Sequence, residues 1–284
     1  MDISIVIVSW NVKNKLRENL RSIMQSSGAS FEVLVVDNNS SDGTIDMLKS
    51  EFPSVRLIAN LGNLGFAQAC NQGIELSIGR YILLLNPDMK LLANTLADTV
   101  AWCDAHPQAA VTGIKLISES NELIPQVRRF PSLADQLAII LKAPHLFPGI
   151  LDSYLRKDFD YSQAARVDSI RGAYFMIRRS TIEKIGRLDE RYFLWFEEVD
   201  YCRRVADKGL EVWYTPSAQV IDYIGQSFNQ VKRSTKQHYF KESMISYFKK
   251  WHSSQAFLIV VAWYLGTAMS ALGDVFKMKS KTRT

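Results

Sequence analysis

One stretch of the chain decides its fold: Phe31-Glu32-Val33-Leu34-Val35-Val36-Asp37-Asn38-Asn39-Ser40-Ser41-Asp42-Gly43, residues 31–43. An apolar run of strand length ends there in a dense group of turn-forming residues. The same pattern, with helical segments in between, recurs through the first half of the chain and predicts an α/β protein. Continuous apolar strands of this kind are typical of a mostly parallel sheet with helices on both faces. The predicted strands are Ile3–Val8, Phe31–Val36, Val55–Ile58 and Tyr81–Leu85, with a helix at Phe66–Ile78.

Polar residues follow three of these predicted strands directly. They are Ser9-Trp10-Asn11, Asp37-Asn38-Asn39 and Asn86-Pro87-Asp88. Ligands of open α/β sheets bind beyond the carboxyl ends of the strands. The three clusters therefore predict a binding site at one edge of the sheet.

Two of the acids at this edge allow more than one interpretation. Asp88 could hold a hard divalent cation that in turn holds a diphosphate, or it could cap a helix that begins near Leu91-Leu92. Asp37 could accept from a base or a ribose hydroxyl, or it could simply close an Asx turn.

A third group of acids lies at Glu197-Glu198-Val199-Asp200. Like charges so close together raise the pKa of at least one carboxyl group, which suits a general base near neutral pH. The alternative is a solvated helix start, where acids are also favourable. The preceding run Tyr192–Phe196 is apolar, which favours a functional site over a solvated face.

The second half of the chain is less regular. It predicts strands at Ala109–Ile117, Ile170–Arg178 and Glu211–Tyr214, and helices at Glu197–Asp207 and Lys236–Lys250. Residues 128–168 contain three prolines and weak periodicity, which predicts a mobile or partner-shaping insertion.

Several classes of site are excluded or disfavoured. No G-x-G-x-x-G follows the first strand, which argues against a nicotinamide dinucleotide, and no G-x-x-x-x-G-K-[ST] occurs, which excludes a P-loop NTPase. The four histidines share no ligand spacing, and the three cysteines form no C-x-x-C pair. A zinc site and a disulfide framework are therefore not expected. The cysteine pattern instead favours a protein of a reducing compartment. Residues 1–8 are expected to form a strand rather than a signal peptide.

Charge divides the chain at about residue 232. The whole chain carries +5, but residues 232–284 hold ten basic and two acidic residues, a charge of +8, which leaves −3 for residues 1–231. No basic stripe covers the first part, so nucleic acid is not an expected partner. We expect residues 1–231 to form the catalytic domain and residues 232–284 a helical tail.

The tail contains the apolar stretch Ala256–Leu272, flanked by lysines on both sides. It is somewhat shorter than the roughly 20 residues of a spanning helix. A basic segment beside an apolar one suggests an anionic membrane surface. A helix packed on the domain and a true membrane span remain the alternatives.

Seven segments occur in a fixed order over most of residues 3–228, and together they resemble glycosyltransferase family 2, which has a GT-A-type fold. Within the family the chain is most similar to the rhamnosyltransferase-type members that build bacterial surface polysaccharides. The segments are Ile7-Val8-Ser9-Trp10-Asn11, Val35 to Gly43, Asn63-Leu64-Gly65-Phe66-Ala67 with Asn71, Leu84 to Asp88, Gly172-Ala173 with Met176, Phe193 to Asp200, and Gly225-Gln226-Ser227.

The resemblance implies roles for individual residues. Asn86-Pro87-Asp88 stands where the family has its DxD-type motif, so Asp88 would be the metal-binding acid and Asn86 replaces the first acid. Glu198 falls at the catalytic base, with Glu197 before it, Asp200 in support and Trp195 in the acceptor wall. The nucleotide-sugar site would comprise Ser9, Asn11, Asp37, Asn39, Asn63, Gly65, Asn86 and Asp88.

One position departs from the family pattern. Relatives commonly have a histidine, which can be a metal ligand, where this chain has Asp222. An aspartate there could act as a hard oxygen ligand for Mg²⁺ or Mn²⁺, or it could mean weaker metal binding.

The resemblance implies an inverting transferase that moves a sugar, with rhamnose as a candidate, from a nucleoside-diphosphate sugar to a hydroxyl of a glycan or lipid-linked acceptor. It would act in the cytoplasm at the inner face of the cell membrane. One alternative is a catalytically silent member that serves as a membrane-bound scaffold or partner. Another is a nucleotidyltransferase, which needs a glycine-rich basic loop that Val12-Lys13-Asn14-Lys15 does not supply.

Overall fold

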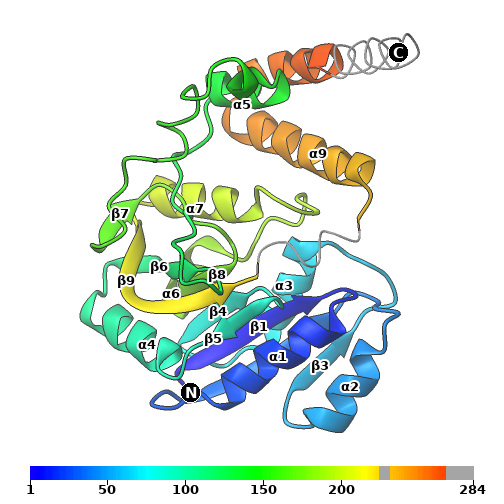
Figure 1. Ribbon diagram of the computed structural model, residues 1–284, viewed down its shortest axis with the longest axis vertical. Coiled ribbons are helices and arrows are strands. Elements are labelled where there is room, and N and C mark those ends of the chain that lie inside the picture. The colour runs from blue at the N-terminus through cyan, green and yellow to red at the C-terminus, as the bar shows by residue number, and fades with distance from the viewer. Residues whose placement is uncertain (224–230, 267–284) are drawn as a thin grey trace.

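A computed structural model of the chain describes residues 1–223 and 231–266 (Figure 1). Gly225-Gln226-Ser227 and residues 267–272, both singled out in the sequence, lie outside the described residues. The elements are β1 (Ile3–Ser9), α1 (Lys13–Met24), β2 (Phe31–Asp37), α2 (Thr44–Glu51), β3 (Arg56–Ala59), α3 (Phe66–Leu76), β4 (Tyr81–Leu85), β5 (Met89–Leu91), α4 (Thr95–Ala105), β6 (Ala109–Ile117), α5 (Leu133–Ile140), η1 (Ala143–His145), β7 (Ala165–Val167), β8 (Tyr174–Arg178), α6 (Arg179–Ile185), α7 (Glu197–Asp207), β9 (Glu211–Asp222), α9 (Arg233–Trp251) and η2 (Ser253–Gln255).

The described strands form a single sheet in the order β3-β2-β1-β4-β8-β6-β9-β5, with β7 paired to β9. β1 is parallel to both β2 and β4, and β2 is parallel to β3, so the first half of the chain builds the predicted parallel sheet. β8 enters antiparallel between β4 and β6, while β6 and β9 are parallel. The predicted α/β class is confirmed, and β5, β7 and β8 are its antiparallel additions.

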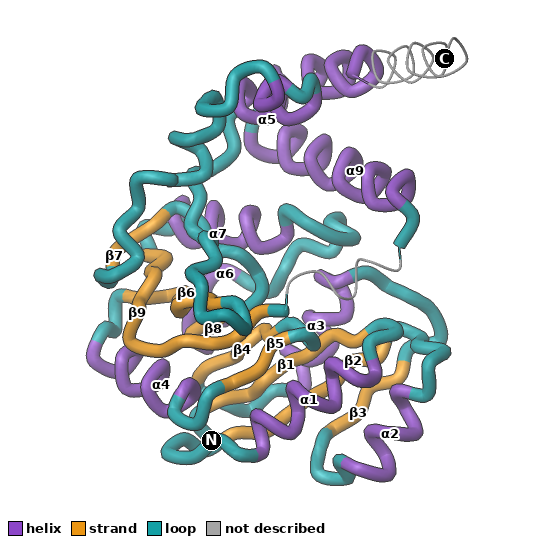
Figure 2. Tube along the Cα trace, in the orientation of Figure 1, coloured by secondary structure: helices purple, strands orange, loops and turns teal. Residues whose placement is uncertain are grey.

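Successive side chains of β1 point into two different hydrophobic cores, one on each face of the sheet. Ile3, Ile5 and Ile7 point into one hydrophobic core together with side chains of α1 and α2. Val6 and Val8 point into a second core, which α3 and α7 complete. Successive side chains of a strand point to opposite faces, so a continuous apolar strand requires helices on both sides (Figure 2).

A third core lies apart from the sheet and joins the C-terminal segments to the rest of the chain. It contains buried side chains of α9 and of the helical residues 256–262, together with Tyr192 and Phe196 from the loop before α7. The predicted tail therefore shares a hydrophobic core with the loop that leads to the acidic cluster. No helix within the described ranges has both the length and the apolar composition to cross a bilayer.

Several predicted boundaries differ from the observed ones. The strand expected from Ile170 begins only at Tyr174, where its antiparallel pairing with Leu85 of β4 starts. The strand expected to end at Tyr214 continues to Asp222, because β6 and β5 flank its second half. The alternative in which Asp88 caps a helix is wrong, since the strand β5 follows it.

The segment 128–168 contains a helix that the sequence analysis did not predict. α5 begins with a capping box, in which the Ser132 hydroxyl accepts from the Asp135 N–H and the Asp135 carboxylate accepts from the Ser132 N–H. The segment returns to the sheet through β7, which pairs with β9. The predicted irregular insertion is therefore anchored at its C-terminal end by a strand.

Candidate functional site

The carboxyl ends of β1 and β2 lie side by side. Ser9 stands opposite Asp37 in the parallel register, and both side chains are fully buried. Asp37 Oδ1 accepts from the Ser40 N–H over 2.8 Å. Asp37 Oδ2 and the Ser9 hydroxyl have no hydrogen-bond partner among the described residues. Buried polar atoms without a partner are unfavourable, so these two groups favour a ligand at this edge.

Asn11 and Asn39 serve the turns around these strand ends. Asn11 has a positive φ of 53°, and its Oδ1 accepts from the Ser41 N–H over 2.7 Å while its own N–H donates to Ser40 Oγ over 2.9 Å. Asn39 also has a positive φ, 67°, and its side chain is exposed. Asparagine tolerates this conformation better than most residues, which accounts for the residue type at both turns.

Asn63 and Gly65 are bonded to the end of β2. The Asn63 carbonyl oxygen Oδ1 accepts from the Gly65 N–H over 3.0 Å and from Asn38 Nδ2 over 3.3 Å. Asn38 Nδ2 also donates to the Gly65 carbonyl over 3.1 Å. Asn63 and Gly65 are thus fixed beside Asn38, the residue that follows Asp37.

Gly65 also touches the loop that precedes the acidic cluster. The Phe66 N–H donates to the Phe193 carbonyl over 2.7 Å. Gly65 has φ +84°, and a Cβ placed on it would lie 2.6 Å from the Phe193 oxygen. Only glycine fits a position with both this conformation and this close approach.

Asp88 lies in the turn after β4, and Asp222 ends the strand β9 that pairs with β5. Asp88 and Asp222 are both buried. In the β5–β9 pairing Met89 is opposite Asp222, and the Tyr223 N–H donates to the Asp88 carbonyl over 3.2 Å. The two carboxyl groups therefore belong to adjacent positions of two paired segments.

Three consecutive residues connect this turn with α7. Arg171 Nη1 lies 3.3 Å from Asp222 Oδ2. A Cβ placed on Gly172 would lie 3.5 Å from the Cβ of Glu198. The Ala173 carbonyl accepts from the Asn86 N–H over 3.0 Å. The segment 171–173 thus contacts three of the predicted site residues.

The acids at the start of α7 have raised proton affinities. Burial raises the pKa of Glu198, against the opposing charges of Arg128 and Arg171. Burial and the neighbouring charge of Glu198 raise the pKa of Glu197 well above its usual range. Oε2 of both residues has no hydrogen-bond partner among the described residues. A carboxylate in this condition is suited to accept a proton from a substrate.

Asp200 faces α9 rather than the strand ends. Its Oδ1 accepts from Trp251 Nε1 over 2.8 Å and from the Tyr192 hydroxyl over 3.3 Å. Its Oδ2 accepts from Lys250 Nζ over 2.9 Å and from Arg204 Nε over 3.1 Å. The carboxylate is completely buried, so it holds the tail on α7 and is not exposed to a substrate.

Trp195 and Phe196 form the turn into α7 in an unusual conformation. Both have positive φ values, 64° and 70°. The ring of Phe240 packs against both, at centroid distances of 5.8 Å and 5.6 Å. Left-handed backbone at bulky residues is strained and persists where surrounding packing enforces it, here the packing of α9.

Two series of contacts connect most of the predicted residues. The first runs from the ends of β1 and β2 through Gly65 to the loop before α7. The second runs from Glu198 through residues 171–173 to the β4–β5 turn. Asn39 and Asp200 lie outside these contacts. Sequence reasoning missed Arg171 and Arg128, and the one signal for Arg171 was its place directly before Gly172-Ala173.

The carboxylates fit a divalent cation that is held partly by substrate. The described residues contain no group of three or more His, Cys, Asp or Glu side chains suited to a metal. Mg²⁺ commonly binds one or two carboxylates together with substrate phosphates. Asp88 and Asp222 can supply these oxygens, although Arg171 already pairs with Asp222.

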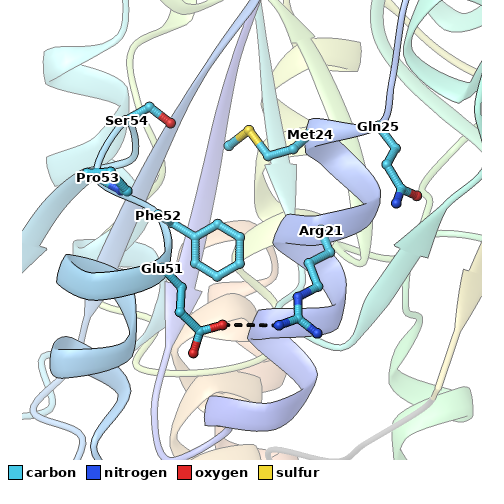
Figure 3. A pocket seen from close by; sticks show the side chains of 7 residues that line it. All are labelled: Arg21, Met24, Gln25, Glu51, Phe52, Pro53 and Ser54. Carbon is cyan, nitrogen blue, oxygen red and sulfur yellow. Dashed lines mark hydrogen bonds and ion pairs between the residues drawn. The ribbon is translucent and has the colours of Figure 1, made fainter.

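A hollow elsewhere on the molecule is unrelated to the predicted residues. It lies between the C-terminal ends of α1 and α2, where Arg21 Nη2 is 3.2 Å from Glu51 Oε2 (Figure 3). Helices that follow parallel strands run back against them, so their C-terminal ends lie at the opposite edge of the sheet from the strand ends. None of the predicted site residues lines this hollow.

The sheet order and the likeness to solved structures define a GT-A-type fold. The chain belongs to glycosyl transferase family 2, whose sequence profile matches residues 4–186. It is 25% identical over 234 residues, 78% of this chain and 76% of the relative, to the N-acetylglucosaminyl-diphospho-decaprenol L-rhamnosyltransferase of Mycobacterium tuberculosis strain H37Rv. It is 23% identical over 261 residues, 89% of this chain and 90% of the relative, to rhamnosyltransferase WbbL of Escherichia coli K12. The predicted similarity to rhamnosyltransferase-type members of family 2 is confirmed.

Solved structures show the same fold. The mannosyltransferase PcManGT from Pyrobaculum calidifontis, in complex with GDP-Man and Mn²⁺, superposes with a TM-score of 0.58 at 16% identity, covering 96% of this chain and 75% of that one. GalNAc-T7 with UDP, GalNAc and Mn²⁺ gives a TM-score of 0.60 at 16% identity, covering 86% and 48% of the two chains. At these identities the likeness concerns the fold alone, and it confirms the GT-A-type architecture.

The contact between Gly65 and Phe193 predicts a difference between two glycine substitutions. Gly65 and Gly186 share the same backbone region, with φ and ψ of 84° and 173° and of 82° and −177°. Alanine is strained there by about 1–3 kcal/mol at either position. Only at Gly65 does the added methyl meet another residue, since nothing lies within 4 Å at Gly186. Gly65→Ala should therefore lower the melting temperature more than Gly186→Ala; equal losses would contradict a tight contact with Phe193.

The raised pKa of Glu197 predicts a pH-dependent gain in stability on its replacement. The folded state binds this proton more tightly than the unfolded chain. The associated stability is present below the ordinary glutamate pKa of about 4.3 and is lost as the pH rises through the raised folded value. Glu197→Gln should thus change stability little near pH 4 and stabilise the protein increasingly at higher pH.

Urea unfolding from about pH 4 to about pH 9 measures this difference. The matched control is Glu183→Gln, because Glu183 is an exposed acid. A gain that is independent of pH, or equal in the control, would contradict the burial of a high-pKa acid at residue 197.

Proposed function

We propose that this protein transfers a sugar, with inversion, from a nucleoside-diphosphate sugar to a hydroxyl group of a glycan or lipid-linked acceptor. The observation that carries the proposal is the position of Glu198. This acid has a raised pKa and an unpartnered oxygen, and through residues 171–173 it is connected to the turn that bears Asp88. The proposed proton acceptor is thus connected to the proposed diphosphate-binding turn.

The donor nucleotide is assigned to the ends of β1 and β2. Asp37 would accept from the base or a ribose hydroxyl through Oδ2, which has no partner among the described residues. Ser9 would line the same pocket, and Asn63 and Gly65 would lie along the nucleotide and diphosphate. Asn11 and Asn39 would shape the surrounding turns, since both have left-handed backbone.

The diphosphate is assigned to the β4–β5 turn. Asp88, with Asp222 beside it, would hold Mg²⁺ or Mn²⁺ together with the phosphates. Such a cation, when bound, offsets the negative charge that develops on the leaving diphosphate. Arg171 and Arg128 add fixed positive charge near Glu198, which a diphosphate or a phosphorylated acceptor would meet.

Glu198 is the proposed general base. It would take the proton of the acceptor hydroxyl while the oxygen attacks the anomeric carbon opposite the leaving diphosphate, and one displacement of this kind inverts the configuration. Glu197 lies directly before Glu198, and burial together with the charge of Glu198 raises the pKa of Glu197 well above its usual range. Asp200 positions α7 through α9, and Trp195 would form part of the acceptor wall.

The relatives support a finer assignment of the substrates. Two of them are named rhamnosyltransferases, and the name of the first includes a diphospho-decaprenol acceptor. We therefore infer a rhamnose donor and a lipid-linked acceptor in the synthesis of bacterial surface polysaccharide. The basic tail of residues 232–284 would attach the protein to the anionic inner face of the cell membrane.

Replacement of the base predicts a specific loss of turnover. General base catalysis contributes about 10²–10⁴-fold, so Glu198→Gln should lower the transfer rate by about that factor and leave donor affinity unchanged. A thermal-shift panel of nucleotide-sugars with Mg²⁺ or Mn²⁺ first selects the donor. The exposed Glu183→Gln is the matched control for the rate measurement.

Two results would contradict this assignment. Unchanged turnover in Glu198→Gln would remove Glu198 as the base. No transfer by the wild-type protein with any stabilising nucleotide-sugar would instead favour a silent scaffold. The presence of Asn86 in the DxD-type turn and the pairing of Asp222 with Arg171 are the features that favour this alternative.

Replacement of Asp88 predicts a loss of metal-dependent donor binding. Calorimetric titration of the donor nucleoside diphosphate with and without Mn²⁺ should show tighter binding with the metal in the wild-type protein. In Asp88→Ala this difference should become much smaller, because one of the two carboxylates proposed to hold the cation is gone. Asp207→Ala removes an exposed acid and should keep the difference; an unchanged Mn²⁺ effect in Asp88→Ala would contradict the assignment.

A further inference from the structure

Exposed apolar side chains are concentrated in two segments of the described chain. Of fourteen exposed large hydrophobic residues, nine lie in these segments. Leu146 and Phe147 are 79% and 61% exposed, and Phe257 is 71% exposed. The first segment, residues 141–150, contributes Leu141, Leu146, Phe147 and Ile150; the second, the 256–266 helix, contributes Phe257, Leu258, Val261, Tyr264 and Leu265.

The 256–266 helix is apolar on two opposite faces. Ala256, Ile259 and Ala262 are buried in the core formed with α9. The five exposed side chains recur at the spacing of a second face, since helical neighbours are three or four residues apart. No other part of the described chain covers this second face, because its side chains are exposed.

The two segments lie next to each other. Ile140, the last residue of α5, shares the core of the 256–266 helix. A Cβ placed on Gly266 would lie 2.8 Å from the Ile140 carbonyl oxygen. Residues 141–150 begin directly after this contact, and α5 lies beside the C-terminal helix in Figures 1 and 2. The exposed side chains therefore belong to one end of the molecule.

Basic side chains lie near these two segments, and basic side chains beside an apolar face suit a surface of anionic lipid. The 256–266 helix has no charged residue, and Lys241 Nζ lies 4.7 Å from the centre of the Tyr264 ring. Lys142 is exposed within the first segment. Residues 232–250 carry six basic side chains and one acid, and of the six only Lys250 forms ion pairs with other described residues, namely Asp189 and Asp200. An apolar helix face that carries a tyrosine, with a lysine beside it, is typical of a helix that lies in a membrane interface.

We propose that residues 141–150 and the 256–266 helix together form one membrane-docking surface for a bilayer of anionic lipid. This inference rests on the proposed attachment of the tail and adds to it a second insertion element, contributed by the segment after α5. The apolar side chains enter the boundary between headgroups and acyl chains, and the flanking lysines remain among the lipid phosphates.

Vesicle co-sedimentation of the full chain tests the surface. The probes are vesicles of phosphatidylcholine alone and of phosphatidylcholine with phosphatidylglycerol. We expect binding to the anionic vesicles, reduced by high salt. Leu146→Ser with Phe147→Ser should lower the partition coefficient by about a hundredfold, because burial of each side chain contributes about tenfold. The double variant Phe257→Ser with Val261→Ser should lower the partition coefficient by a similar factor.

The matched control is Leu61→Ser, because Leu61 is also fully exposed but lies between β3 and α3. It should bind vesicles as the wild type does, and circular dichroism should show that all variants are folded. Binding by the Leu146/Phe147 pair equal to wild type would overturn the two-element surface and leave the tail attachment standing. No binding by the wild type would overturn both. A dimer in solution that these substitutions dissociate, without vesicle binding, would show that the surface joins two copies instead.

Discussion

The burial of the Asp200 carboxylate between α7 and α9 is the interaction on which the arrangement of the site depends. Both oxygens accept from two donors each, and the donors come from the loop before α7, from α7 itself and from the end of α9. Removal of one partner of a buried ion pair commonly destabilises a protein by about 3–5 kcal/mol. Because Glu198 lies two residues before Asp200 on the same helix, the contact that fixes the tail also fixes the direction of the proposed base.

The start of α7 combines a strained backbone with two buried carboxyl groups of raised pKa. Trp195 and Phe196 adopt left-handed backbone, and Glu197 and Glu198 are held in surroundings that disfavour their charged forms. Neither arrangement is stable by local preference. The rings of α9 pack on the strained turn, and Arg128 and Arg171 moderate the pKa of Glu198. The packed tail thus supports a site that the sheet domain alone would not hold in this form.

The predictable parts of the molecule are those set by local sequence. The strands β1 to β4 are predictable because each is a continuous apolar run. Ser9 and Asp37 lie side by side because the parallel strands β1 and β2 end at the same level. The full length of β9 and the late start of β8 depend on pairings with distant segments, so periodicity did not reveal them. For the same reason the pairing of Arg171 with Asp222, and of Lys250 with Asp200, could not be predicted: 51 and 50 residues separate the partners.

Phe240 shows how the chemistry and the outer end of the molecule are mechanically connected. Its ring packs against Trp195 and Phe196 on one side and lies 6.5 Å from the Trp263 ring on the other. Protein cores are close-packed, so these contacts of Phe240 tie the position of the 256–266 helix to that of the turn before Glu197. A surface that holds this helix therefore also restrains the turn. For an acceptor that is anchored in lipid, the same element would then fix both the distance of the enzyme from the membrane and the orientation of its base.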